Sequence, residues 1–120
     1  MIRRTLFALA FGLAATAAAA QAPAPGKVEV VWLGQAAFKI TSPGGKVIVT
    51  DPWLRTNPLT PPEYKKLEAF GRIDVLLLSH GHFDHMADAP ALAEMYKVPL
   101  RAPGDLAQSA MTLGMLPAEL

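Results

Sequence analysis

Cysteine is absent from the 120 residues of this sequence, and histidine occurs only three times. Without cysteine there is no disulfide framework, although an exported protein of this size could have used one. Stability therefore has to come from a hydrophobic core, with bound metal as the other available contribution.

An excess of charge is also absent, since 11 Lys and Arg stand against 10 Asp and Glu. Arg3 and Arg4 lie in the first few residues, and without them nine basic side chains face ten acidic ones, a formal charge of −1. A near-neutral protein without a basic stripe offers no electrostatic footprint for nucleic acid. No nucleic-acid partner is expected, and the oligomeric state stays open.

The N-terminal residues have the organisation of a signal peptide. Arg3 and Arg4 form a charged start, Leu6 to Ala20 is an apolar stretch rich in alanine, and Ala18-Ala19-Ala20 provides small residues for cleavage before Gln21. The stretch is short for a membrane span, so no stable span is expected after cleavage, and an uncleaved anchor is the alternative. We expect residues 1–20 to be a signal peptide and the protein to be periplasmic or secreted.

Residues 21–27, with Pro23 and Pro25, are expected to be a flexible tether, and residues 28–120 the folded part. Apolar patterning and turn residues then predict antiparallel strands followed by a β-α-β-α order. The expected strands are 28–33, 37–41, 46–50, 73–79 and 98–102. The expected helices are 63–70, one capped by Asp88 that runs through Met95, and one from Asp105, with a capping box to Gln108, that ends at Gly114. Trp32 is expected in the core.

All three histidines fall within one window, His80-Gly81-His82-Phe83-Asp84-His85, directly after the apolar run 73–79. Imidazole nitrogens and carboxylate oxygens are ligands preferred by zinc and similar divalent ions. The site would lie beyond the carboxyl end of a buried strand, where ligands of open α/β sheets bind. We expect Gly81 to let the loop turn so that His80, His82, Asp84 and His85 converge on one metal site.

His-x-His-x-Asp-His after an apolar strand resembles the hallmark motif of the metallo-β-lactamase superfamily. The upstream segments Val30 to Ile40 and Lys46 to Leu54, with Asp51-Pro52-Trp53, are similar to a branch containing ascorbate-phosphate lactonases and N-acylphosphatidylethanolamine-type phospholipases. The resemblance covers about residues 28–120. It implies an α/β fold class, here the N-terminal half of an αββα sandwich, because about 100 residues can form one sheet and cover one side of it.

For the histidine segment, the resemblance implies a metal site in which His80 and His82 hold a first ion and Asp84 and His85 hold a second. The ions would be zinc, one or two in number, with manganese as the alternative. A metal-bound hydroxide would attack an ester, lactone or phosphodiester of a small-molecule substrate, and Asp84 could be catalytic as an acid or base. The resemblance also implies that Asp51 lies beneath the site and braces the histidine loop, and a plain Asp-Pro turn is the alternative.

The family pattern requires three further ligands downstream, whereas this sequence has no histidine after His85. Asp88 and Asp105 are better explained as helix caps than as a bridging ligand. The chain is therefore expected to be an N-terminal part of an exported metal-dependent hydrolase, to bind metal weakly by itself and to be nearly inactive. A non-catalytic metal-binding protein or relic, and a nuclease of the same superfamily, are the alternatives.

Overall fold

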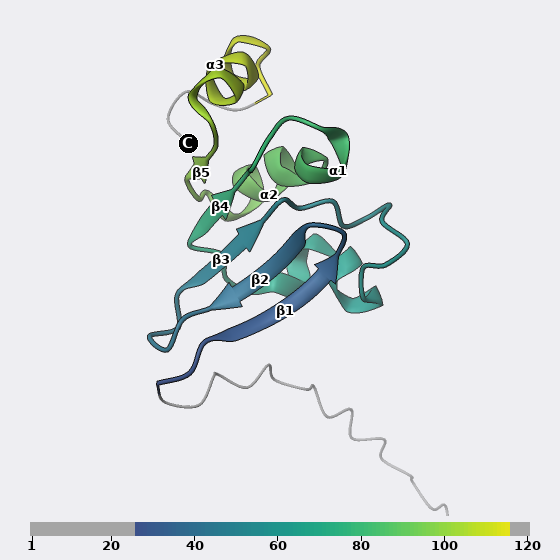
Figure 1. Ribbon diagram of the computed structural model, residues 1–120, viewed down its shortest axis with the longest axis vertical. Coiled ribbons are helices and arrows are strands. Elements are labelled where there is room, and N and C mark those ends of the chain that lie inside the picture. The colour runs from purple at the N-terminus through teal and green to yellow at the C-terminus, as the bar shows by residue number, and fades with distance from the viewer. Residues whose placement is uncertain (1–25, 116–120) are drawn as a thin grey trace, which may run out of the picture.

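Five strands form one mixed sheet in the computed structural model, which describes residues 26–115 (Figure 1). The strands lie in the order β1-β2-β3-β4-β5, which is also their order along the chain. Their bounds are β1 Glu29–Gly34, β2 Ala37–Thr41, β3 Val47–Thr50, β4 Val75–Leu77 and β5 Leu100–Arg101. The expected signal peptide at 1–20 and most of the expected tether at 21–27 lie outside the described residues.

The first three strands are antiparallel, as their spacing predicts. Pro43, Gly44 and Gly45 form the turn between β2 and β3, where Gly45 has φ of 77° and donates its N–H to the carbonyl of Ser42. The tighter turn between β1 and β2 consists of Gln35 and Ala36, directly after Gly34. The pairing of the two strands is irregular between Trp32 and Gly34. These turns fix which side chains of each strand face the core.

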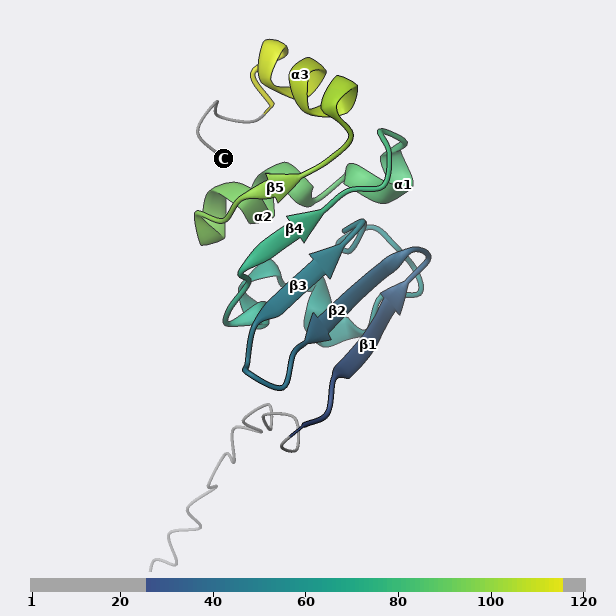
Figure 2. The ribbon, with the colours of Figure 1, turned by 60° about the vertical axis from the view of Figure 1, so that its left-hand side comes forward.

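The strands β3, β4 and β5 run parallel to one another. Parallel strands end at the same edge of a sheet, so Asp51, directly after β3, and the histidine segment after β4 come close together. Figure 2 shows the end of β4 leading into α1 at this edge. The sheet topology thus brings together two segments about 30 residues apart in the sequence.

The helix expected over 63–70 is instead two single 3-10 turns, η1 Pro62–Lys65 and η2 Leu67–Phe70. They are separated at Lys66, which has extended backbone angles. The apolar side chains of Tyr64, Leu67 and Phe70 recur every third residue, and this spacing matches the three residues per turn of a 3-10 helix. The same spacing led to the expectation of one continuous helix over residues 63–70.

Three α-helices follow β4: α1 Phe83–Met86, α2 Ala89–Tyr96 and α3 Gly104–Thr112. The capping roles expected from the sequence are wrong for two aspartates. Asp88 precedes α2 but makes no capping hydrogen bond, because its carboxylate binds the segment after β3. Asp105 lies inside the first turn of α3, whose N-cap is Pro103, so there is no capping box. None of the helices within residues 26–115 is long and apolar enough to cross a membrane.

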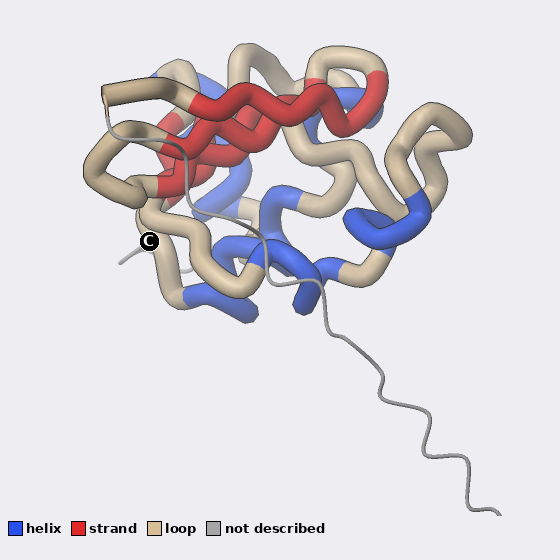
Figure 3. Tube along the Cα trace, turned by 90° about the horizontal axis from the view of Figure 1, so that it is seen from below, coloured by secondary structure: helices blue, strands red, loops and turns tan. Residues whose placement is uncertain are grey.

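The helices cover one face of the sheet, seen edge-on in Figure 3. The core between them contains Leu33, Val49, Leu54, Leu76 and Leu92, all fully buried. Burying a leucine side chain contributes about 1.5–3 kcal/mol, so this single layer of contacts is the main source of stability.

The opposite face of the sheet is apolar yet exposed. Val30 is 59% and Trp32 51% exposed, so the expectation that Trp32 is a core residue is wrong. A row of apolar side chains crosses this face: Val30 pairs with Ile40, Ile40 with Ile48, and Ile48 with Val75. The last three are half-buried. The α/β class is confirmed, and the described residues form one sheet with helices on one side, as expected for half of a layered sandwich.

Candidate metal centre

The histidine segment begins three residues after the end of β4, and its second half is helical. His80 and His82 precede α1, with His82 at the N-cap position, whereas Asp84 and His85 lie within the single turn of α1. The expectation of a loop through residue 85 is therefore correct only up to His82. The helical turn directs Asp84 and His85, which are adjacent in sequence, about 100° apart around the helix axis.

Gly81 is expected to let the backbone turn tightly, and it does so with a φ outside the left-handed region. Its lack of a side chain matters for another reason. A Cβ atom at Gly81 would lie 3.1 Å from Cδ1 of Leu106 in α3, closer than most real Cβ contacts. Gly81 therefore lets the histidine segment pass tightly beneath α3.

Ser79 and Asp51 form a hydrogen-bonded base under the histidines. The backbone N–H of Ser79 donates to Oδ1 of Asp51 at 2.7 Å, and the Ser79 hydroxyl donates to Oδ2 at 2.9 Å. Asp51 is 8% exposed and has φ of 41°, an uncommon value for a residue other than glycine. These two hydrogen bonds attach the start of the histidine segment to the end of β3.

The same hydroxyl lies beside two imidazole rings. Nδ1 of His80 is 3.0 Å and Nδ1 of His85 is 3.2 Å from Ser79 Oγ, and Nδ1 of His85 is also 3.2 Å from Oδ2 of Asp51. Because the single hydroxyl proton is directed to Asp51, the hydroxyl oxygen acts as an acceptor towards the rings. This arrangement favours a proton on Nδ1 and leaves Nε2 of each ring with a free lone pair.

The rings of all three histidines are neighbours. The centroid of the His80 ring is 4.6 Å from that of His82 and 3.9 Å from that of His85. Oδ2 of Asp84 is 3.7 Å from Nε2 of His85. The four predicted ligands are thus brought to one place, but among residues 26–115 no three or more His, Asp or Glu side chains are arranged to hold one ion.

Asp84 has a partner that the sequence analysis missed. Nε2 of Gln35 donates to Oδ2 of Asp84 at 2.9 Å, across 49 residues of sequence. This hydrogen bond is the main cause that lowers the pKa of the Asp84 carboxyl. The carboxylate is thereby kept ionised, the form that can bind a cation or accept a proton. Ser79 was also missed, although a serine closing an apolar strand is a visible signal.

The donor set fits a divalent ion by its chemistry. Histidines that bind metal generally donate their second ring N–H to a carboxylate or another acceptor, which fixes the tautomer and orients the ring. Nδ1 of His85 has such a carboxylate in Asp51, and Nδ1 of His80 has the Ser79 oxygen. By the chemistry of their donor atoms, the candidate ligands for a divalent ion are His80, His82, Asp84 and His85.

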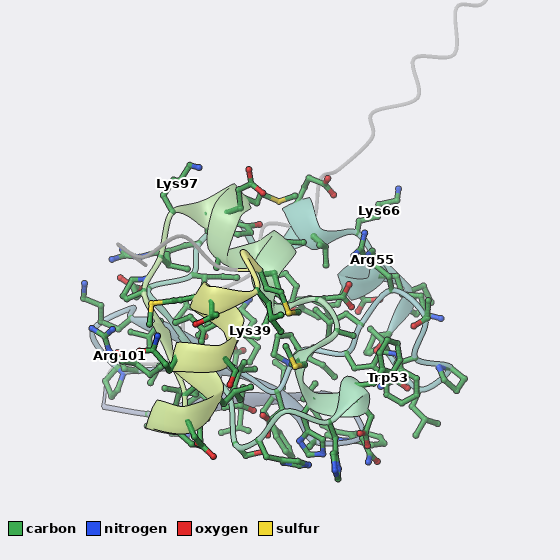
Figure 4. All side chains as sticks on the ribbon, turned by 90° about the horizontal axis from the view of Figure 1, so that it is seen from above. Lys39, Trp53, Arg55, Lys66, Lys97 and Arg101 are labelled. Atoms are coloured by element: carbon green, nitrogen blue, oxygen red, sulfur yellow. The ribbon has the colours of Figure 1, made fainter. Side chains whose placement is uncertain are left out.

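An open cavity of about 270 Å³ lies on the other side of α1. It is lined by Arg55, Thr56, Phe83, Ala87 and Asp88. Trp53 packs its ring edge-on against Phe83 with the centroids 5.9 Å apart, and Figure 4 shows Trp53 and Arg55 on the same side of the molecule, beside α1. Trp53 is half-buried, so it forms part of a wall beside the histidine segment.

The described residues thus combine a mixed sheet with a cluster of histidines directly beyond β4. Residues 29–112 match the family model described as "Beta-lactamase superfamily domain". The chain therefore belongs to the metallo-β-lactamase superfamily, as its motif indicates.

Several relatives carry the name UPF0173 metal-dependent hydrolase. The protein from a Polaromonas species is 63% identical over 98 residues, covering 82% of this chain and 36% of the relative. The protein from Cupriavidus necator is 57% identical over 96 residues, covering 80% of this chain and 33% of the relative. The chain thus spans about a third of the length of these relatives.

A solved structure with a similar fold is Igni18, described as a novel metallo hydrolase from the archaeon Ignicoccus hospitalis. Its TM-score is 0.63 at 25% sequence identity, and the match covers 74% of this chain and 37% of Igni18.

Proposed function

We propose that this chain carries the first ligand segment of a metal-dependent hydrolase, in which His80, His82, Asp84 and His85 bind one or two divalent ions. The observation that carries the proposal is the Asp51–Ser79 base, which occupies Nδ1 of His80 and His85 and leaves both Nε2 atoms free. The names of the relatives support the same activity. Zinc suits the imidazole-rich donor set, and manganese is the alternative.

When bound, such an ion polarises the bond under attack and makes water a stronger nucleophile near neutral pH. The residues of this chain have separate tasks around it. Asp51 and Ser79 orient the rings of His80 and His85, and the ionised carboxylate of Asp84 accepts a proton or a cation. The histidine segment therefore needs its hydrogen-bonded base in order to present its ring nitrogens together.

The substrate proposed is a small molecule with an ester, lactone or phosphodiester bond. Support comes from the cavity of about 270 Å³ beside α1, whose lining includes Phe83, the neighbour of Asp84 in the sequence. Export to the periplasm or outside the cell belongs to the same proposal and depends on residues 1–20. Mass measurement of the protein recovered from a periplasm would then give Gln21 as the first residue, whereas a full-length chain in the membrane fraction would contradict export.

Replacement of His82 tests the metal-dependent reaction. In the gene product that carries this chain, His82→Ala should weaken zinc binding by about 100-fold or more, because loss of a ligand costs at least as much as loss of a supporting group. Hydrolysis of generic ester and phosphodiester substrates should fall with it. Asp105→Ala, which removes an exposed carboxylate outside the cluster, is the control and should leave both unchanged. Equal zinc affinity in wild type and His82→Ala would contradict the proposal.

A non-catalytic metal-binding role is the second candidate. It is favoured by one observation, that the side chains of residues 26–115 do not by themselves assemble a group of three ligands for one ion. Zinc binding that depends on His82 without any zinc-dependent hydrolysis would support this role over the hydrolase.

A further inference from the structure

The turn between β1 and β2 is built to hold Gln35 against the predicted ligand Asp84. We propose that Gln35 is a positioning residue of the metal centre, which fixes the Asp84 carboxylate so that Oδ1 is directed to the ion. The proposal rests on the proposed function, since it assumes that Asp84 is a ligand. It adds to the site a residue of the β1–β2 turn, which lies outside the histidine motif and far from it in the sequence.

The first observation is the hydrogen bond itself. Nε2 of Gln35 donates to Oδ2 of Asp84 at 2.9 Å, and the same Oδ2 lies 3.7 Å from Nε2 of His85. An amide that occupies one carboxylate oxygen limits rotation of the carboxylate and leaves the other oxygen for a cation. Ligating carboxylates are commonly held in this way.

The second observation is the backbone of Gln35. Its φ is 53°, in the left-handed region that glycine adopts freely and that a side chain makes unfavourable. Within residues 26–115, the other non-glycine residues with positive φ are Asp51 and Lys97. Asp51 also contacts the histidine segment, whereas Lys97 is the C-cap of α2. A side chain kept in a strained turn next to a site is typical of residues with a functional contact.

The third observation is that the turn is braced from both sides. The indole N–H of Trp32 donates to the carbonyl of Gln35 at 2.9 Å. The neighbouring Gly34 is packed so closely that a Cβ atom there would lie 2.8 Å from Nδ2 of the buried Asn57. The Thr60 hydroxyl donates to the carbonyl of Leu33 at 2.7 Å. The turn is thus held in place, although Gln35 itself is exposed.

Replacing Gln35 by glycine distinguishes a role in positioning Asp84 from a role in the stability of the fold. Gln35→Gly relieves the backbone strain and removes the amide, so we expect an equal or higher melting temperature together with zinc affinity about 10-fold to 100-fold lower. Lys97→Gly is the matched control, because it relieves the same strain away from the histidines. It should leave zinc affinity unchanged. Full zinc affinity in Gln35→Gly would overturn the proposal.

A double-mutant cycle tests whether Gln35 acts through Asp84. Zinc affinity of the gene product is measured by competition with a chromophoric chelator for wild type, Gln35→Ala, Asp84→Ala and the double variant. We expect Gln35→Ala to lower affinity about 10-fold or more in wild type and to have no further effect once Asp84 is alanine. The same fold-loss in both backgrounds would overturn the proposal.

The hydrogen bond can also be observed without metal. The side-chain amide resonances of Gln35 should move towards those of a glutamine in an unfolded peptide when Asp84 is replaced by alanine, and unchanged resonances would contradict the contact. If Asp84→Ala leaves zinc affinity intact, the proposed role of Asp84 as a ligand fails, and the positioning role fails with it. If Asp84→Ala lowers zinc affinity but Gln35→Ala does not, only the positioning role of Gln35 is wrong, and Asp84 remains a ligand.

Discussion

Ser79 is the residue on which the geometry of the histidine segment depends. Its hydroxyl lies within 3.2 Å of an Asp51 oxygen and of Nδ1 of both His80 and His85. One oxygen atom therefore sets the orientation of two predicted ligands. The family resemblance led to the expectation that Asp51 braces the histidine segment, but it did not identify the Ser79 hydroxyl as the group between them.

Ser79→Ala is expected to weaken zinc binding by about 10-fold to 100-fold while leaving the fold intact, since the effect of supporting groups on metal affinity is of that size. Metal titration with a competing chelator measures it. Ser109→Ala, which changes an exposed serine of α3, is the control and should bind zinc like wild type. If Ser79→Ala also binds zinc normally, the hydroxyl does not orient the rings.

Asp74 links the β2–β3 hairpin to the start of β4. Its carboxylate accepts hydrogen bonds from the Val47 backbone and the Lys46 ammonium, and it pairs with the Arg72 guanidinium, which holds the pKa of the Asp74 carboxyl well below its usual range. A lowered pKa in the folded state contributes stability above the unfolded pKa of about 4, and this contribution is lost as the pH falls below that value.

Asp74→Asn should therefore lower the melting temperature most at pH 6 to 7, and the difference from wild type should shrink as the pH approaches 3. Thermal unfolding of both proteins across this range measures the effect. A difference that does not depend on pH would show that the charge of Asp74 is not what stabilises the hairpin.

At the scale of the elements, Asp88 joins α2 to the segment after β3. It is 3% exposed, and its carboxylate accepts the backbone N–H groups of Leu54 and Arg55 and pairs with the Arg55 guanidinium at 2.6 Å. The position before α2 led the sequence analysis to a capping role. The carboxylate instead satisfies backbone donors of a segment that has no regular secondary structure.

Asp88→Ala should cost about 2 kcal/mol of unfolding free energy, because buried backbone donors lose their acceptor. Asp88→Ser distinguishes the two roles, since serine is a good N-cap residue but is too short to reach Leu54 and Arg55. We expect serine to be as destabilising as alanine in urea unfolding. Recovery of most of the stability with serine would restore the capping interpretation.

The elements were predictable where local patterning and turn residues agree. The hairpin of β2 and β3 follows from Pro43-Gly44-Gly45 between alternating strands, and the strand before His80 follows from its apolar run. The expectation failed for η1 and η2 because a three-residue apolar spacing fits both helix types. Gln35 could not be predicted as a site residue because its partner is 49 residues away.

At the scale of the whole molecule, the sheet has a core on one face and exposed apolar side chains on the other. Leu33 is fully buried, whereas Val30, on the opposite face of the same strand, is 59% exposed. The relatives are about three times as long as the matched part, so a second layer over the exposed face is consistent with their length.

In this chain, Leu33→Ala should therefore cost about 2–5 kcal/mol, and Val30→Thr should change the unfolding free energy by less than about 0.5 kcal/mol. Denaturant unfolding of the two variants gives the comparison. A cost for Val30→Thr close to that of Leu33→Ala would mean that the outer face of the sheet is covered in solution.

The most direct test of the metal centre is nitrogen NMR of the three imidazole rings, recorded before and after addition of zinc in excess. Ligation through Nε2 should shift the Nε2 resonances of His80 and His85 and leave their Nδ1 atoms protonated and bonded towards Ser79 and Asp51. Ring resonances that do not change when zinc is added would contradict the proposed metal site. Ligation through Nδ1 of His80 or His85 would contradict the role of Asp51 and Ser79 in orienting these rings.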